Sequence, residues 1–323
     1  NGKVKNITHP KNMYADIQLD RFETSKTDIE NAININLIPK NISVPATIRT
    51  QGKFKGYTSK FDAELVLQTS LGNAEAVLKM DSPNHSDTTY DAKLAINHFN
   101  LGQFLKDTAL LGPLTMHTNI NGKGLSAQTI LANISTEVNE ITFKNYPYKD
   151  LKLEGVIDKK SFDGKINIAD TNIAFSYAGF INLDSAHTTY DFDLNLLGAD
   201  LKALHLSDEN IRVSTFLKTD LKKENTDNIT GTAVLKNTLI IKDDIRYPVD
   251  SVLLTSAYTE KDADISITSS LLNASLKGDI TIKELPASLK KHFENYFDLQ
   301  QKDTIKKLKH QQFKFELSVN DPT

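Results

Sequence analysis

Apolar and polar residues alternate along most of the chain. In one representative stretch, apolar residues stand at Leu151, Leu153 and Val156, then from Phe162 to Ile168, and again at Phe192, Leu194 and Leu196. A period of two is typical of strands with one apolar and one polar face. Clusters of Asp, Asn, Lys and Ser separate these runs and predict turns. The pattern therefore predicts a mainly β protein.

The chain also repeats itself at a period near 100 residues. Thr-Thr-Tyr-Asp at 88–91 recurs at 188–191, and Tyr146-Pro147 returns as Tyr247-Pro248. Independent landmarks with one spacing indicate a repeat array. We expect one continuous array over 1–323, with about five strands in each repeat and these approximate bounds: 1–44 (partial), 45–146, 147–247 and 248–323 (partial).

Short helical elements are predicted at the ends of the repeats. After each Thr-Thr-Tyr-Asp strand the apolar period lengthens, and Asn100 or Asp200 is placed to cap a helical turn. The third repeat enlarges this element to a helical segment over 284–310. Lysines around its apolar stripe allow contact with a membrane surface, but the pattern favours a helix that flanks the sheet with its lysines in water.

The apolar faces of such strands are covered in one of three ways: in a two-sheet sandwich, in a closed barrel, or in an open trough. Three copies without Gly- or Pro-rich linkers favour continuous stacking. We therefore predict an elongated, repetitive sheet that curves into an open groove with an apolar interior, plus short helices. The residues expected to face the groove are Leu65, Leu67, Leu94, Ile96, Ile166, Ile168, Ile173, Phe175, Phe192, Leu194, Leu196, Ile265, Ile267, Ile280 and Ile282.

Composition narrows the function. The 323 residues carry 38 Lys and Arg against 41 Asp and Glu, a net charge of -3, which argues against a nucleic-acid partner. Cysteine is absent, so disulfides, thiolate catalysis and cysteine zinc sites are excluded. No apolar run is long enough to span a bilayer. The chain starts without Met and ends in Asn-Asp-Pro-Thr, and we interpret it as a fragment of a longer protein.

No catalytic, metal or cofactor site is predicted. The eight His residues are scattered and form no pair with the spacing of a zinc site. The pairs Asp184 with Asp191 and Asp262 with Asp264 resemble a glycosidase pair or a calcium site only loosely, and solvated loops explain them better. We expect the protein not to be an enzyme.

Several segments resemble a known family. They are 148–155 (Tyr-Lys-Asp-Leu-Lys-Leu-Glu-Gly), 162–166, Asp170, Gly179 and 199–201. The chain resembles the middle of a TamB protein of the AsmA-like superfamily, in the form found in Bacteroidota. The resemblance covers most of the chain but depends on spacing and alternation. It implies a periplasmic β-groove between inner and outer membranes, with a membrane anchor outside this chain.

The same resemblance implies phospholipid transport to the outer membrane and, in some members, outer-membrane protein assembly with a partner of the BamA/TamA type. Our first hypothesis is therefore a groove that binds phospholipid acyl chains, because each buried CH₂ contributes about 0.8 kcal/mol without demands on geometry. The alternative is a structural β-repeat stalk or adhesin with filled sandwich cores. An enzyme that acts on glycans is a distant third.

Overall fold

The structure is a computed structural model of the chain. It describes residues 1–323 except 7, 10–11, 33–38, 84–86, 224–227, 260–261, 281–283, 285–310 and 321–323. The predicted helical segment 284–310 and the groove candidate Ile282 therefore lie outside the described residues, apart from Glu284.

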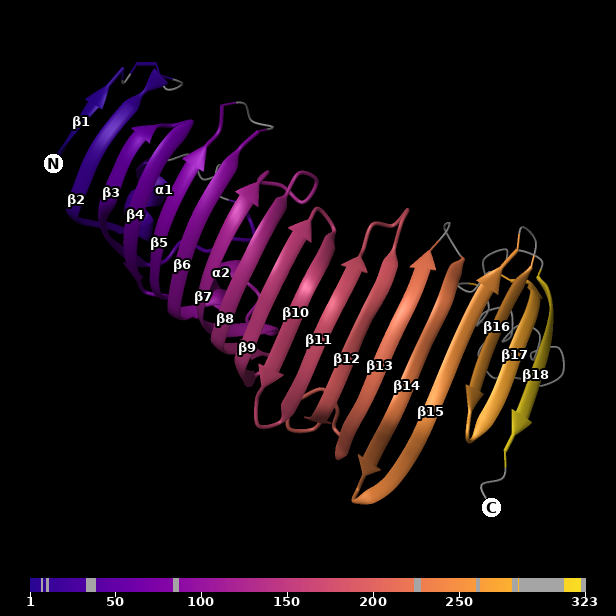
Figure 1. Cartoon of the computed structure of the whole chain (residues 1–323). Helices are drawn as coiled ribbons and strands as arrows, with labels where there is room; N and C mark the ends of the chain where they lie inside the picture. Colours follow the sequence, from indigo (N-terminus) through magenta and orange to yellow (C-terminus); the bar gives the residue numbers. More distant parts are fainter. Residues whose placement is uncertain are drawn as a thin grey trace, which may run out of the picture. The chain divides into compact units, whose positions relative to one another are not determined.

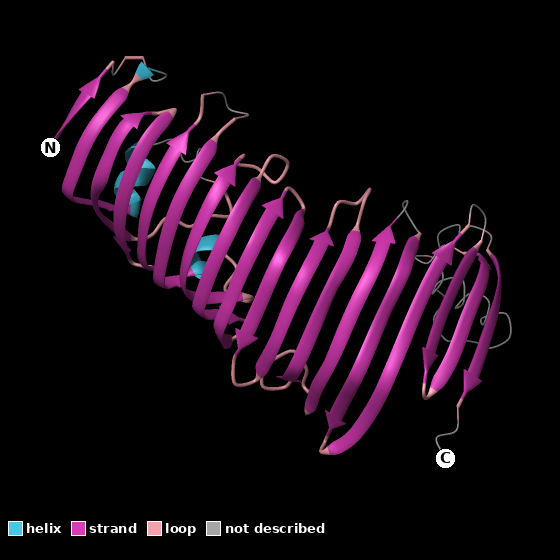
Figure 2. Ribbon diagram, viewed as in Figure 1, coloured by secondary structure: helices cyan, strands magenta, loops and turns pink. Residues whose placement is uncertain are grey.

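The described residues form a mainly β protein, as the alternation predicts (Figures 1 and 2). Eighteen strands belong to one antiparallel sheet, which is not closed into a barrel. Strands make up 71% of the described residues, which also hold two short helices, so the predicted fold class is confirmed.

The chain divides into two compact units, of which unit 1 comprises 1–176 and 199–209. Each of its strands β1 to β10 pairs with the next in antiparallel fashion. Its elements are β1 (Gly2–Lys5), β2 (Tyr14–Ser25), α1 (Lys26–Ala32), β3 (Thr47–Tyr57), β4 (Lys60–Thr69), β5 (Gly72–Asp81), β6 (Thr89–Asn100), α2 (Leu101–Leu105), β7 (Leu111–Lys123), β8 (Leu131–Phe143), β9 (Tyr146–Asp158), β10 (Ser161–Ala169) and the first residues of β11 (Ile173–Asn182).

Unit 2 comprises 177–198 and 210–323, and strands β13 to β18 pair consecutively within it. Besides the end of β11 and most of β12, it holds three strands of 13 or 14 residues, β13 to β15, and three of 7 or 8 residues, β16 to β18. Its remaining elements are β12 (Thr189–Asp200), β13 (Ile211–Lys223), β14 (Ile229–Lys242), β15 (Ile245–Tyr258), β16 (Ala263–Ser269), β17 (Leu272–Asp279) and β18 (Gln312–Val319).

The pairing register of unit 1 aligns its apolar residues into rows that cross the strands. Because side chains of paired residues point to the same face of a sheet, each row lies on one face. The middle row is Leu19, Gly52, Leu65, Ala76, Leu94, Thr118, Thr136, Leu153 and Ile166. The rim row, four residues away along each strand, is Ala15, Gly56, Phe61, Met80, Tyr90, Gly122, Ala132, Ile157 and Phe162.

On the side of the middle row away from the rim row, the strands are irregular at similar positions along their length. The register shifts between Ile96 and Phe99 in β6, and neighbouring strands shift at the corresponding level. His98 and Asp150 have positive φ, 47° and 53°. Such bulges bend a strand and increase its twist. Beyond them the same face continues with a further row, which we name the closed-end row: Phe99, Leu114, Ile141 and Tyr148.

The repeat comprises six strands, not the five expected. β3 to β8 form one copy and β9 to β14 the next, and equivalent backbone bonds mark the same places. The N–H of Asn100, Asp200 and Asn320 donates to the carbonyl of Leu71, Asn172 and Leu271, at 2.6, 2.9 and 2.9 Å respectively. Asn320 is thus the third counterpart of Asn100. The segment 281–310 therefore lies between the third and fourth strands of its repeat, one connection earlier than predicted.

The expected helical turns do follow the fourth strands. The Asn100 carboxamide accepts from the Gln103 N–H at 2.9 Å and caps α2, as predicted. The Asp200 carboxylate accepts from the Ala203 N–H at 3.0 Å and holds a turn that does not extend into a helix. The Thr-Thr-Tyr-Asp repeats also have the predicted role, because β6 and β12 start at their second Thr.

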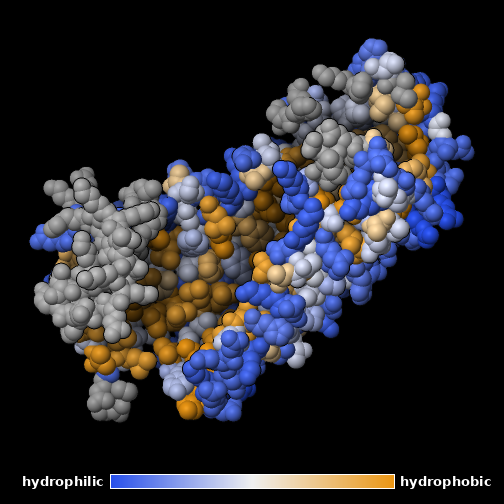
Figure 3. Space-filling view, turned by 180° about the vertical axis from the view of Figure 1, so that it is seen from behind, coloured by the Kyte–Doolittle hydropathy of each residue, from blue (hydrophilic) through white to orange (hydrophobic). Residues whose placement is uncertain are grey.

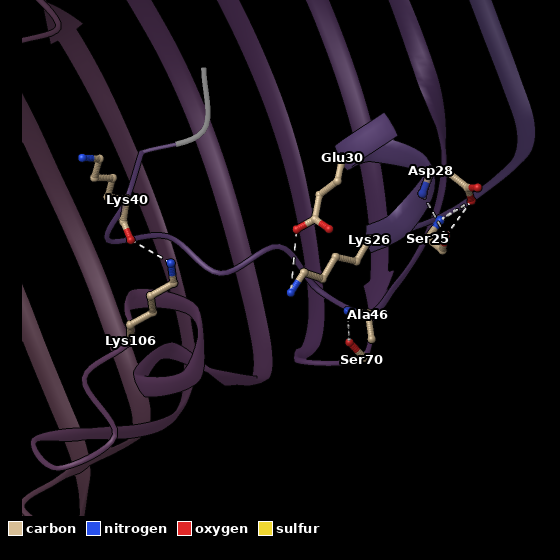
Figure 4. Close-up of polar contacts among 8 residues, drawn as sticks. All are labelled: Ser25, Lys26, Asp28, Glu30, Lys40, Ala46, Ser70 and Lys106. Atoms are coloured by element: carbon tan, nitrogen blue, oxygen red, sulfur yellow. Dashed lines mark hydrogen bonds and ion pairs between the residues drawn. The ribbon is translucent and has the colours of Figure 1, made fainter. Parts of the chain in front are cut away.

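The connection between β2 and β3 replaces a two-residue turn with a long crossing segment (Figure 4). At the equivalent β8–β9 connection, Lys144 and Asn145 form a tight turn with φ of 48° and 63°. The β2–β3 segment begins with α1, where Ser25 and Asp28 bond reciprocally in a capping box. It then reaches α2, where the Lys106 ammonium donates to the Lys40 carbonyl at 2.7 Å.

A polar cluster joins the start of β9 to the loop after β10. The Asp170 carboxylate is 9% exposed and accepts from the Tyr146 hydroxyl, from Lys149 N–H at 3.1 Å and from Asn172 N–H at 2.8 Å. Burial, together with the Asp170 charge, raises the pKa of the Tyr146 hydroxyl, so this group stays protonated and donates at neutral pH.

The cluster yields a stability prediction. Asp170→Ala leaves a hydroxyl and two backbone N–H groups without their acceptor in a buried place, so we expect a loss of about 3 kcal/mol in the free energy of unfolding. Asp163→Ala, at an exposed position of the neighbouring β10, is the control and should change it by less than about 0.5 kcal/mol. Urea unfolding followed by circular dichroism measures both. Equal stabilities of the two variants would contradict the assigned role of Asp170.

Candidate functional site

The apolar face of unit 1 is the candidate site. Large and small side chains alternate across its strands: in the middle row Leu65 on β4 and Leu94 on β6 flank Ala76 on β5. The adjacent row inverts the arrangement, with Leu78 on β5 between Ala63 on β4 and Ala92 on β6. Large and small side chains therefore alternate both across and along these strands, so the face has relief rather than a flat surface.

The register brings six of the predicted groove residues of unit 1 together. Leu65, Leu94 and Ile166 belong to the middle row, while Leu67, Ile96 and Ile168 belong to the row between it and the bulges. Both rows cross eight strands or more. Ile173 and Phe175 share one face of β11 by alternation.

In unit 2 the predicted residues that the structure describes lie on two strands, β12 and β16, and on the connection after β17. Phe192, Leu194 and Leu196 share a face of β12, where the Phe192 ring packs 5.2 Å from that of Tyr177. Ile265 and Ile267 on β16 pair with Ser256 and Leu254 of β15 and with Leu276 and Ala274 of β17. Ile280 follows β17 and is buried.

These side chains are covered only in part. Among the fourteen predicted residues that the structure describes, Ile168 and Ile280 are buried, and the others are half-buried or, like Ile267, exposed. In the whole described part only eleven apolar residues are buried, and five of these are alanines. Figure 3 shows apolar side chains gathered on a hollowed face and bordered by hydrophilic ones. The described residues therefore do not fill this face with a core of their own.

Hydroxyl groups on this face bond to each other. Thr118 and Thr136 are neighbours in the middle row, and their Oγ1 atoms lie 2.7 Å apart. Thr118 is only 4% exposed. Because each hydroxyl satisfies the other, the pair contributes its methyl groups to the face without an unpaired polar atom.

One end of the face is closed by α2. Phe104 of α2 packs on Phe99 of the closed-end row, with ring centroids 5.4 Å apart in an edge-to-face arrangement. The carbonyl of Phe104 accepts from the Ser43 N–H at 2.7 Å, which fixes α2 to the β2–β3 connection. In the next repeat Leu204 takes the equivalent place, fully buried, in the turn that begins at Asp200.

The opposite face of the sheet is polar. Charged residues on adjacent strands pair across it, as Lys60 does with Asp81 at 2.6 Å and Lys152 with Glu137 at 2.9 Å. These ion pairs are solvent-exposed and contribute little to stability each. Because the charged residues favour contact between this face and water, we take the opposite, apolar face as the candidate site.

A hollow of about 650 Å³ also lies in unit 1, at the level of the middle row. Its lining combines middle-row residues, among them Leu65 and Leu94, with the residues beside them along each strand, including Glu64, Glu75 and Lys93. Its charges are of both signs and point to no particular ligand.

The acidic pairs considered for catalysis have structural roles. Asp184 accepts from the Ala186 N–H at 2.9 Å within its own turn, and Asp264 pairs with Lys277 at 2.9 Å. Across the residues that are described, no three His, Asp or Glu side chains gather as a metal site. Neither described helix combines the length and the apolar character that a membrane span needs.

Sequence alternation did not reveal the closed end of the face. Phe99, Phe104 and Tyr148 follow irregularities that interrupt the period of two, so they were not among the predicted groove residues. The repeated capping residues Asn100 and Asp200 are the signal that marks this place in the sequence.

Comparison with known proteins finds no match: neither a family model, nor a curated protein, nor a solved structure is similar to this chain.

The threonine pair allows a sharp test of the face. Thr118→Val leaves the Thr136 hydroxyl without its partner in a part-buried place, and we expect a loss of about 1 to 2 kcal/mol in the free energy of unfolding. The double variant Thr118→Val/Thr136→Val removes both hydroxyls and should recover most of that loss. A double-mutant cycle by urea unfolding measures the coupling, and additive losses would show that the two hydroxyls do not depend on each other.

Proposed function

We propose that this chain binds the acyl chains of membrane lipids along its apolar face and guides them as a segment of a lipid-conducting groove. The observation that carries the proposal is the half-exposed state of four successive apolar rows in unit 1, backed by a polar face of paired charges. In water, an exposed apolar surface of this extent is typical of a site that binds a partner or an apolar ligand.

Acyl chains suit this face better than a ligand with polar groups. The described rows offer methyl and methylene surface from Leu, Ile, Ala and Phe, and the paired hydroxyls of Thr118 and Thr136 are already satisfied. Transfer of a CH₂ group from water to such a surface contributes about 0.8 kcal/mol and is non-directional. An acyl chain can therefore slide from strand to strand along the face without losing a specific contact.

The resemblance to the TamB family supplies the setting of the proposal. In that setting the segment lies in the periplasm, conducts phospholipids between inner and outer membranes, and belongs to a longer membrane-anchored protein. A partner of the BamA/TamA type and a contribution to outer-membrane protein assembly belong to the same proposal. No catalytic step and no cofactor is involved; direction and energy come from outside the segment.

Charge placed on the apolar face tests the proposal. Ile166→Arg puts a guanidinium into the middle row, where an acyl chain would have to desolvate it, so we expect lipid occupancy to fall at least tenfold. Asn167→Arg, one residue on, puts the same charge on the polar face and should leave occupancy unchanged. Leu194→Arg and Asn195→Arg form the equivalent pair on β12.

Native mass spectrometry with lipid extraction measures occupancy in these variants. Co-purified phospholipid that is lost in Ile166→Arg and kept in Asn167→Arg supports the groove. An unmodified protein that carries no lipid and takes up none from vesicles would instead favour a structural β-repeat whose apolar faces cover one another between copies.

A further inference from the structure

The apolar face of unit 1 has a defined depth along its strands. On β6 the apolar side chains run from Tyr90 in the rim row through Ala92 and Leu94 to Ile96, just before the bulge. These six steps span roughly 20 Å at about 3.4 Å per residue. The hydrocarbon core of a bilayer is about 30 Å thick, so the chains of one leaflet extend about 15 Å. A membrane acyl chain therefore fits along a strand, between the rim and the bulges.

The two ends of that depth differ. Past the rim row the strands end in polar residues, such as Lys60, Asp81 and Lys123. Past the bulges, the edge-to-face contact of Phe104 on Phe99 stands at the end of β6. Leu114, which pairs with Phe99, is 6% exposed, so the closed-end row is closely packed at the point where Phe104 contacts it.

The closure at Phe104 is held by polar contacts on its far side. Its carbonyl accepts from the Ser43 N–H, and the neighbouring Lys106 ammonium donates to the Lys40 carbonyl (Figure 4). Gly102, two residues before Phe104, is buried so close to the Leu111 carbonyl that no side chain fits there. These contacts fix α2 in place, so the position of Phe104 is set by the backbone and not by a ligand.

We propose that Phe104 and the closed-end row act as a ruler for acyl-chain length in unit 1. This inference rests on the proposed function and adds a specificity to it. The headgroup stays in water at the polar rim, the chain follows the strands across the apolar rows, and its methyl end meets the aromatic closure. Chains up to the depth of the face gain contact with every added CH₂, and longer chains gain nothing more.

Titration of the protein with saturated fatty acids of increasing chain length, followed by displacement of a fluorescent fatty acid, tests the ruler. Affinity should rise about fourfold with each added CH₂ until the chain fills the depth, and then stay constant. Phe104→Ala should move this limit to longer chains, and Phe104→Trp should move it to shorter ones. Phe61→Ala, which removes an aromatic ring at the rim row, is the control and should weaken binding at all lengths without moving the limit.

The outcomes separate the ruler from the groove. An affinity that rises without limit in the unmodified protein, or a limit that stays in place in both Phe104 variants, overturns the ruler and leaves lipid binding intact. No binding at any chain length overturns both. Because Phe104→Trp enlarges the side chain while Phe104→Ala shrinks it, opposite shifts cannot arise from a common loss of folding, which circular dichroism checks in each variant.

Discussion

The fold depends on the hydrogen-bond ladder between antiparallel strands more than on a packed core. Most globular proteins of this size bury many large side chains, but here the described residues bury only eleven apolar ones, and Leu204 is the one large apolar side chain among them that is completely enclosed. In most pairs of neighbouring strands of unit 1, the ladder joins ten or more residues of one strand to the next. Such a sheet holds its shape through its backbone, so its apolar face is free to remain unfilled.

The irregular positions determine how that face ends. With a regular period of two, the apolar face would continue to the ends of the strands and be exposed to water there. Instead, the bulge at His98 shifts the register of β6 against β7, and Asp150 on β9 has a positive φ of 53°. Beyond these positions Phe99 and Tyr148 lie in one row, where α2 and the Asp170 cluster meet them. Bulges are features that re-aim side chains, and here they convert an open row into a closed one.

Alternation and repetition were enough to predict the class of fold and the face of most candidate residues. Leu65, Leu94 and Ile166 are 29 and 72 residues apart in the chain, yet the period of two assigns them to one face, and the pairing register places them in one row. The number of strands per repeat was missed where β7 and β8, the fifth and sixth strands of their copy, carry Thr118 and Thr136 in the middle row in place of the Leu or Ile of neighbouring strands. The closed-end residues were missed because a bulge reverses the parity on which the prediction depends.

Under the proposed function, the same physics constrains the pattern of the apolar face more than the identity of its residues. Contacts between an apolar face and an acyl chain are non-directional, so any side chain of suitable size and polarity serves at a given row position. A leucine opposite an alanine, as at Leu65 and Ala76, is equivalent in volume to a glycine opposite a phenylalanine, as at Gly179 and Phe192. What such a function constrains is the order of large, small and polar positions along each strand. Individual identities are constrained only where geometry is special: at the left-handed bulge positions, at the buried Gly102, and at the capping residues Asn100 and Asp200.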